Sequence, residues 1–150
     1  MEKLRKITQE QLEEILLKHK LWLEGKEGGE CANLSYVDLG YANLTGTNLI
    51  GANLEYANLG YANLKGANLI GATLTSAYLE NADLRYANLR GADLEGADLR
   101  YTDLKGAYLG YVYLGYVYLV YANLTGANLT SANLENADLE KADLEDTILK

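Results

Sequence analysis

The side chains that most often act as nucleophiles, bases or metal ligands are scarce in this chain. Apart from its acidic residues, it offers His19, Cys31 and three serines, Ser35, Ser76 and Ser131. A serine nucleophile needs an adjacent base, and a tetrahedral zinc site needs about four ligands. A single histidine and a single cysteine are too few for zinc, and no base recurs at a fixed distance from the serines. We therefore expect no catalytic residue and no metal site.

Aspartate and glutamate are abundant, with 21 in 150 residues, but they lie in a regular, outward-facing pattern. A carboxyl group needs a cleft or a charged neighbour to gain the raised pKa of a general acid. The sequence also lacks the glycine loops that bind phosphates or dinucleotides, and the glycine-rich calcium repeat. We expect no enzyme activity and no cofactor.

Charge and hydropathy exclude two further classes of partner. The formal net charge is −8 and the pI is about 4.6, which disfavours direct binding to nucleic acid. No run of 18 apolar residues and no signal peptide is present, so we expect no membrane association. The lone Cys31 excludes an internal disulfide and favours a reducing compartment such as the cytoplasm.

Leucine recurs at every fifth position from Leu34 to Leu149, which makes 24 positions in one register. Alanine usually stands two residues before each leucine, and asparagine or aspartate one residue before it. A period of five fits neither a helix nor a continuous strand. It fits a short extended piece followed by a turn, with Ala and Leu pointing inward and their neighbours outward. The fifth residue, mostly Gly, Tyr, Ser or Asn, suits a corner with unusual backbone angles.

Tandem units such as Ala42-Asn43-Leu44-Thr45-Gly46 and Ala92-Asp93-Leu94-Glu95-Gly96 resemble the pentapeptide-repeat proteins. The resemblance covers residues 32–150. It implies an all-β fold, a right-handed quadrilateral parallel β-helix with four pentads per coil. A β solenoid of about six coils would then be roughly 29 Å long, and residues twenty apart would stack in one column.

Residues 1–31 lie outside the repeat, and we treat them as a separate segment before the β-helix of residues 32–150. Thr8 and Gln11 form a capping-box pattern that predicts a helix start, and Gly25 is a plausible end. Lys26 to Glu30 are predicted to form a short polar linker with two more glycines. The apolar face of this helix would comprise Leu12, Ile15, Leu16 and Trp22.

A solenoid exposes its terminal coil, so the simplest role for this amphipathic helix is an N-terminal cap. The alternative is that the helix binds a partner or a membrane. Six basic and seven acidic residues in the segment 1–31 do not suit a membrane surface. We therefore expect the cap.

Two surface features could serve as docking sites. Lys65, Arg85 and Lys105 would stack in one column, where Asp83 and Asp103 could relieve their repulsion. The simpler interpretation of this column is a solvated charged face with local ion pairs, and the alternative is a docking surface. Tyrosines are also dense in one stretch, where they could form an interface. The alternative is that they simply favour a β surface and pack over neighbouring glycines. The members of this stretch are Tyr101, Tyr108, Tyr111, Tyr113, Tyr116, Tyr118 and Tyr121.

Two functions follow. The first is a non-enzymatic structural or protein-interaction scaffold. The second comes from the resemblance: some pentapeptide-repeat proteins imitate duplex DNA and bind bacterial type II topoisomerases, chiefly DNA gyrase. About 29 Å of duplex DNA carries roughly 17 charges, whereas the repeat region has 14 acidic and seven basic residues. We therefore prefer the scaffold, in the bacterial cytoplasm.

The C-terminal coil leads to a prediction about self-association. Ile148 replaces the usual Asn or Asp, next to Leu149, while residues 131–150 carry a net charge of −4. The charge could by itself discourage edge pairing, or two copies could meet end to end. We predict a weak, salt-promoted homodimer through this coil. Sedimentation at several salt concentrations tests it, and a monomer throughout, unaffected by Ile148→Asp, would show that the charged edge suffices.

Overall fold

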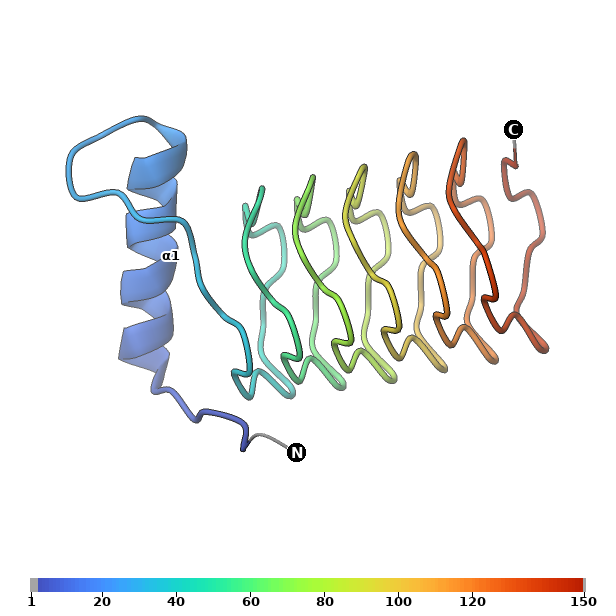
Figure 1. Ribbon diagram of the computed structural model, residues 1–150, viewed down its shortest axis with the longest axis horizontal. Coiled ribbons are helices and arrows are strands. Elements are labelled where there is room, and N and C mark those ends of the chain that lie inside the picture. Colours follow the sequence, from blue (N-terminus) through green and yellow to red (C-terminus); the bar gives the residue numbers. More distant parts are fainter. Residues whose placement is uncertain (1–2, 150) are drawn as a thin grey trace.

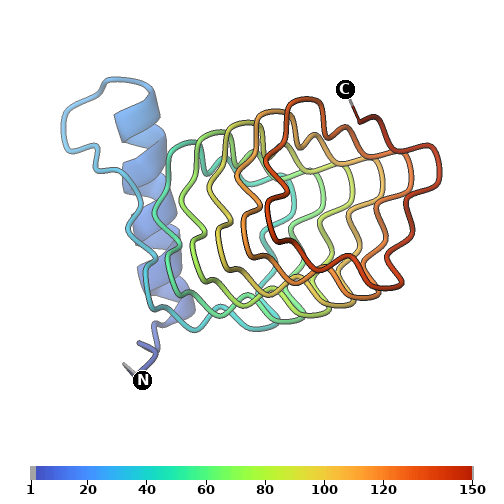
Figure 2. The same cartoon turned by 45° about the vertical axis from the view of Figure 1, so that its right-hand side comes forward.

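The computed structural model describes residues 3–149 and consists of one helix followed by a four-sided parallel β-helix (Figure 1). Helix α1 (Gln9–Leu23) lies across one end of the rod, and the chain then winds away from it in successive coils. The oblique view shows that neighbouring coils keep nearly the same outline (Figure 2). All four sides are therefore built from the same local structure.

Residues twenty apart pair with each other along the whole rod. The pairs are single parallel bridges, which begin with Asn33 and Asn53 and end with Asn128 and Ile148. The Leu34 N–H donates to the Asn53 carbonyl at 2.7 Å, and the Asn53 N–H donates to the Ala32 carbonyl at 2.9 Å. Because each pentad turns after this short stretch, none of the described pentads extends into a longer strand.

Each pentad ends in a β-turn whose third residue has a positive φ angle. The Val37 N–H donates to the Leu34 carbonyl, and the intervening Tyr36 has a φ of 57°. The same sign recurs at every fifth residue up to Asp146, whereas the turn's second residue keeps a negative φ, the pattern of a type II turn. Eight of these corners are glycine and nine are tyrosine. The left-handed conformation is strained for a side chain. Six of the nine tyrosine corners stack in pairs across adjacent coils, whereas no ring stack is found for Tyr86, Tyr111 and Tyr116 among the described residues.

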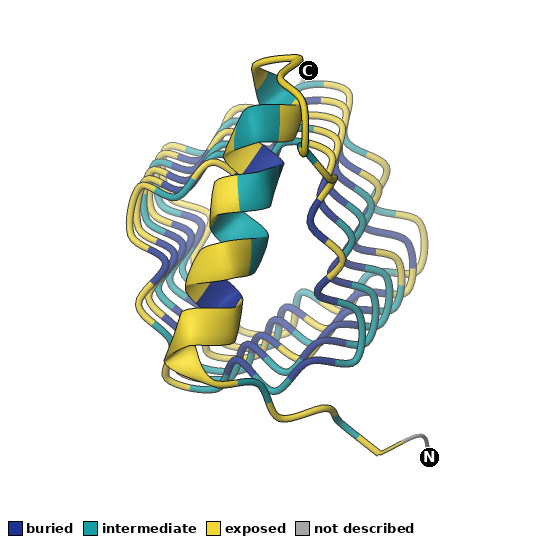
Figure 3. Cartoon of the chain, turned by 90° about the vertical axis from the view of Figure 1, so that its left-hand side faces the viewer, coloured by how far each residue is buried: buried dark blue, intermediate teal, exposed yellow. Residues whose placement is uncertain are grey.

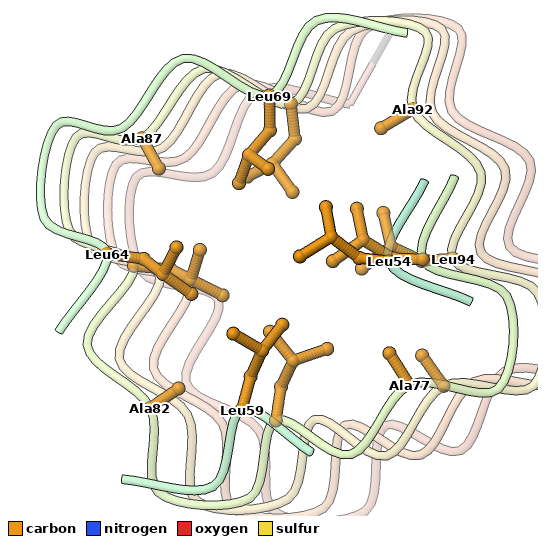
Figure 4. Close-up of a cluster of buried hydrophobic side chains, with 14 of the residues drawn as sticks. Leu54, Leu59, Leu64, Leu69, Ala77, Ala82, Ala87, Ala92 and Leu94 are labelled. Carbon is orange, nitrogen blue, oxygen red and sulfur yellow. The ribbon is translucent and has the colours of Figure 1, made fainter. Parts of the chain in front are cut away.

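The leucines of the four sides converge on the axis of the rod. Figure 4 shows Leu54, Leu59, Leu64 and Leu69 pointing inward from the four sides of one coil, with alanines of other coils nearer the corners. These four side chains have no measurable exposure. Burying each leucine contributes about 1.5–3 kcal/mol. The inward position predicted for Ala and Leu is confirmed.

The Asn or Asp before each leucine closes the turn with its own side chain. The Asn53 Oδ1 accepts from the Glu55 N–H at 2.9 Å, and the Asp98 Oδ1 accepts from the Arg100 N–H at 3.2 Å. This is an Asx-turn, in which a short polar side chain replaces a backbone acceptor. The preference of the repeat for Asn and Asp at this position therefore has a local cause.

Helix α1 begins as the sequence predicted. The Thr8 side chain accepts from the Gln11 N–H, and the Gln11 side chain accepts from the Thr8 N–H, so the capping box is confirmed. Gly25, which follows the C-cap residue Glu24, has a φ of 64°. The helix therefore ends where a left-handed residue follows it, as helices commonly do.

Helix α1 lies over the open end of the first coil (Figure 3). Leu12 is buried, and Ile15 and Leu16 pack against the core. Trp22, assigned to the same face, is 44% exposed, and His19 instead is fully buried. The His19 Nδ1 accepts from the Ala32 N–H at 3.1 Å. The buried Nε2 has no partner among the described residues.

The segments flanking α1 fix it to the rod. Before the helix, Arg5 pairs with Val37 as an added strand: its N–H donates to the Tyr36 carbonyl, and its carbonyl accepts from the Asp38 N–H. After the helix, Gly29 passes so close to it that an added Cβ would lie 2.3 Å from the Trp22 backbone nitrogen. Only glycine fits there without a shift of the linker.

The turn geometry predicts that two glycines respond differently to alanine. Gly126 has a φ of 66° and open space around it, so Gly126→Ala should cost about 1–2 kcal/mol from backbone strain alone. Gly110 has no positive φ, and an added Cβ would make only ordinary contacts, so Gly110→Ala should be neutral or slightly stabilising. Urea denaturation measures both, and equal effects would contradict the turn assignment.

The burial of His19 predicts a pH dependence. Burial lowers the pKa of His19, so the unfolded chain takes up this proton at a higher pH than the folded chain. The unfolded state then binds more protons below about pH 6.5, and stability should fall as the pH drops from 7 towards 5, by at most about 1.4 kcal/mol per pH unit. Urea melts of the wild type and of His19→Asn should differ in this slope. Parallel slopes would show that His19 does not contribute.

Candidate functional site

The tyrosine-rich stretch forms a belt around the rod. Tyr108, Tyr113 and Tyr118 lie on three successive sides, and Tyr111 and Tyr116 occupy the corners between them. All five are more than half exposed. Residues close in sequence are therefore spread over three sides, and no flat partner could contact all of them at once.

Tyr101 and Tyr121, the other two residues of that stretch, occupy one corner in adjacent coils. Their rings stack with centroids 5.1 Å apart, and the Lys141 Nζ lies 5.0 Å from the centre of the Tyr121 ring. The Lys141 Nζ also donates to the Tyr121 hydroxyl at 2.8 Å. This corner shows how stacking across coils can stabilise side chains at strained positions.

A different set of tyrosines encloses a groove, which we call the tyrosine groove. It has a volume of about 740 Å³ and runs along one side of the rod in its N-terminal half. Pockets of 300–1,000 Å³ are typical of ligand sites. The lining residues are Leu4, Tyr36, Gly40, Tyr41, Tyr56, Asn58, Gly60, Tyr61, Tyr78, Glu80 and Asp98.

Stacked tyrosine pairs form the two walls of the groove. Tyr36 and Tyr56 stack at one corner of this side with centroids 4.9 Å apart, and Tyr41 and Tyr61 stack at the other with centroids 5.0 Å apart. Each pair consists of residues twenty apart in adjacent coils. Since all four have a positive φ near 60°, the turns fix the direction in which their side chains leave the backbone.

The floor between the walls is low because two glycines occupy it. Gly40 and Gly60 follow the leucines of this side, where other coils carry larger residues such as Arg100 and Val120. The Asn58 Nδ2 donates to the Asp38 Oδ1 at 2.9 Å, and the Gly60 N–H donates to the Asn58 Oδ1 at 3.0 Å. The floor is thus a hydrogen-bonded surface without protruding side chains.

Tyr78, Glu80 and Asp98 close the far end of the groove. Burial opposes the ionisation of Asp98, but hydrogen bonds from the Arg100 side chain and backbone outweigh it and lower the pKa of Asp98. The Arg100 guanidinium donates to both Asp98 carboxylate oxygens, at 2.8 and 2.5 Å, and lies 3.8 Å from Glu80. None of the described side chains that line the groove is basic.

The groove was not predicted from the sequence, although its signal is present there. Tyr36 and Tyr56, like Tyr41 and Tyr61, are twenty residues apart, with Gly60 in the column between them. The number of tyrosines per length of sequence instead favoured the stretch from Tyr101 to Tyr121 as the interface. In a four-sided rod, spacing by one coil indicates spatial proximity better than closeness in sequence.

In the basic column, Arg85 is compensated by Asp83 and Asp103 as predicted, whereas no ion pair of Lys65 or Lys105 is found among the described residues. The Arg85 guanidinium is 2.5 Å from the Asp83 carboxylate and 3.6 Å from that of Asp103.

In the C-terminal coil, the side chains of Ile148 and Leu149 are 43% and 57% exposed. The homodimer through this coil stays a prediction.

Two kinds of structure were not found in residues 3–149. The side chains described there include no group of three or more His, Cys, Asp or Glu that could hold a metal ion. Among the same residues, no helix has the length and apolar character to cross a bilayer.

Several solved structures are similar to this chain, and three of them are described here. Rfr23 from the cyanobacterium Cyanothece 51142 is 39% identical, with a TM-score of 0.59, over 66% of this chain and 65% of that one. HetL from Nostoc sp. strain PCC 7120, involved in heterocyst differentiation regulation, is 33% identical over 79% of this chain and 66% of its own, with a TM-score of 0.59. A pentapeptide repeat protein from the Arabidopsis thaliana thylakoid lumen is 36% identical over 66% and 69%, with a TM-score of 0.64.

This chain spans about two thirds of the length of each of these relatives. No protein of curated function matches it. The family model for pentapeptide repeats matches in eight copies, over residues 32–71, 62–100, 77–114 and 107–146. Members of that family fold as right-handed quadrilateral β-helices. The chain therefore belongs to the pentapeptide-repeat family.

Proposed function

We propose that this protein is a non-enzymatic protein-interaction solenoid whose contact site is the tyrosine groove. The observation that carries the proposal is the pair of stacked tyrosine walls on either side of a glycine floor. Tyrosine is enriched among the residues that dominate protein interfaces. Tyr41 and Tyr61 are 77% and 55% exposed, so a partner could cover a large aromatic area.

The groove is also preorganised. Each wall tyrosine is held at its turn by main-chain hydrogen bonds to the next coil, such as that from the Tyr41 N–H to the Gly60 carbonyl at 3.0 Å. Its ring is further supported by the stacked ring of the adjacent coil. A binding site whose side chains are already ordered loses less conformational entropy when a partner binds. This favours a recognition role over a purely structural one.

We further propose that α1 acts as the N-terminal cap. The burial of Leu12 and His19 and the pairing of Arg5 with Val37 support this role, since together they cover the apolar end and one edge of the first coil. Leu4, just before the added strand, also lines the groove. The capping segment would then help to form the binding site.

Imitation of duplex DNA, with a bacterial type II topoisomerase such as gyrase as the partner, is the second candidate. The surface charges give it weaker support than the groove gives to protein binding. Arg85 and Arg100 each lie within salt-bridge distance of two carboxylates, which interrupts the acidic surface. We retain the cytoplasm as the proposed compartment, although one relative comes from the thylakoid lumen.

A matched pair of variants tests the groove as the contact site. Tyr61→Asn removes a wall residue, and Asn81 occupies the same corner column with a φ of 60°, so the fold should tolerate it. Tyr101→Asn is the control in that column, outside the groove. In affinity capture from a bacterial lysate, we expect specific partners to be retained by the wild type and by Tyr101→Asn but lost by Tyr61→Asn.

Equal capture by all three proteins would contradict the groove as the contact site. A gyrase supercoiling assay on the same preparations tests the second candidate. Inhibition that Tyr61→Asn leaves unchanged would favour DNA mimicry over groove binding.

A further inference from the structure

We infer that the tyrosine groove binds a proline-rich peptide in the polyproline II conformation, lying along the axis of the rod. The inference rests on the proposed function and adds the chemical class of the partner. Three features of the groove support it: the hydrogen-bonding groups it leaves open, its spacing and its charge.

The groove cannot bind a peptide by adding a β-strand. The Tyr41 N–H donates to the Gly60 carbonyl, the Tyr61 N–H donates to the Glu80 carbonyl, and the Gly60 N–H donates to Asn58. The main chain of the two wall-bearing coils is therefore occupied by bonds between coils and within turns. An extended strand placed here would leave its own N–H groups without acceptors, which is costly in a partly desolvated site. A chain rich in proline has few N–H groups to satisfy.

The donors that stay open suit such a chain. Within the described part of the protein, the hydroxyls of Tyr41 and Tyr61 make no hydrogen bond. A third open donor is the Glu80 N–H. In the two preceding coils, the Gly40 N–H donates to the Asp38 side chain and the Gly60 N–H donates to the Asn58 side chain. Two residues before Glu80 stands Tyr78, which has no such acceptor oxygen on its side chain near the turn. These donors can reach the carbonyls of a polyproline II chain, which are fully exposed.

The dimensions of the groove also match. Each wall has one tyrosine in each of two adjacent coils, and the two ring pairs stack at 4.9 and 5.0 Å. The floor column from Gly40 through Gly60 to Glu80 spans two coil spacings. These come to about 9.6 Å, close to the ~9.3 Å rise of one polyproline II turn of three residues. The corresponding repeat of an extended strand is about 6.7 Å. From the coil of Tyr36 to that of Asp98 is three spacings, ~14 Å, the length of about five polyproline II residues.

The aromatic walls and the acidic end complete the match. Aromatic-lined grooves recognise proline-rich segments, and such a chain is already ordered before binding. At the far end, Arg100 engages Asp98 through two hydrogen bonds but approaches Glu80 only to 3.8 Å. Glu80 is thus the more available carboxylate, and a lysine at one end of the peptide would complement it.

The test uses the full chain and a labelled peptide of nine prolines and one terminal lysine. Fluorescence anisotropy should show saturable binding, and a glycine–serine peptide with the same lysine should bind far more weakly. Tyr61→Asn should raise the Kd by about tenfold or more, the loss expected of a central interface aromatic. Gly60→Val should do the same by filling the floor. Its Cβ would lie 3.2 Å from the Asn58 Oδ1, which requires a small shift of that side chain, and Val120 occupies the same column.

Matched controls keep the result interpretable. Tyr101→Asn lies in the same column as Tyr61, and Gly115→Val introduces a Cβ that meets only ordinary contacts at 3.8 Å. Both should bind the proline peptide as the wild type does. Thermal melts by circular dichroism identify any variant that fails to fold. If Tyr61→Asn or Gly60→Val fails to fold, it is replaced by Tyr41→Asn, which should weaken binding in the same way.

Absence of saturable binding to the proline peptide, or binding that Tyr61→Asn and Gly60→Val leave unchanged, would overturn the inference. Equal binding of the glycine–serine peptide would do so as well. The proposed function fails separately: if partner capture still depends on Tyr61 while the proline peptide does not bind, the groove is a contact site for a partner of another chemistry.

Discussion

The structure depends on main-chain hydrogen bonds between residues twenty apart. The Leu34 N–H binds the Asn53 carbonyl, and equivalent bonds recur at each pentad until the last described coil. These bonds form in register only if the chain turns by the same amount after every five residues. That requirement explains the positive φ at each corner and the leucine at each centre. The shape of the surface is then fixed by the register, and the outward side chains are added to a backbone that hardly changes.

The sequence predicted the parts that depend on this local repetition. The inward Leu and Ala, the capping box of Thr8 and Gln11, and the pairing of Arg85 with Asp83 each follow from residues at a fixed short spacing. It did not predict which helix residue would be fully buried. His19 and Trp22 are one turn apart on the same face, and the angle at which α1 crosses the coil decides between them. Spacing along a helix does not specify that angle.

The tyrosine groove shows a second limit on what could be predicted from the sequence. Its walls and floor come from three columns, and each column is an ordinary variation of the repeat when examined alone. Tyrosine at a corner is common in this chain, as is glycine after a leucine. The site arises only where two tyrosine corners flank a glycine floor in the same pair of coils. The strain of a left-handed tyrosine is offset by its stacked neighbour, so the same contact that stabilises the corner also builds the wall.

The pairing of residues twenty apart also determines how this protein tolerates a change in length. An insertion of twenty residues between Leu69 and Leu74 would lengthen the rod by one coil and keep every downstream residue on its own side. An insertion of five residues there would preserve the leucine core equally well, but it would rotate the whole downstream surface by a quarter turn. Tyr78, Glu80 and Asp98 would then leave the side that carries Gly40 and Gly60. The core of this protein therefore tolerates changes of chain length in multiples of five residues, whereas the arrangement of its surface is preserved only by changes in multiples of twenty.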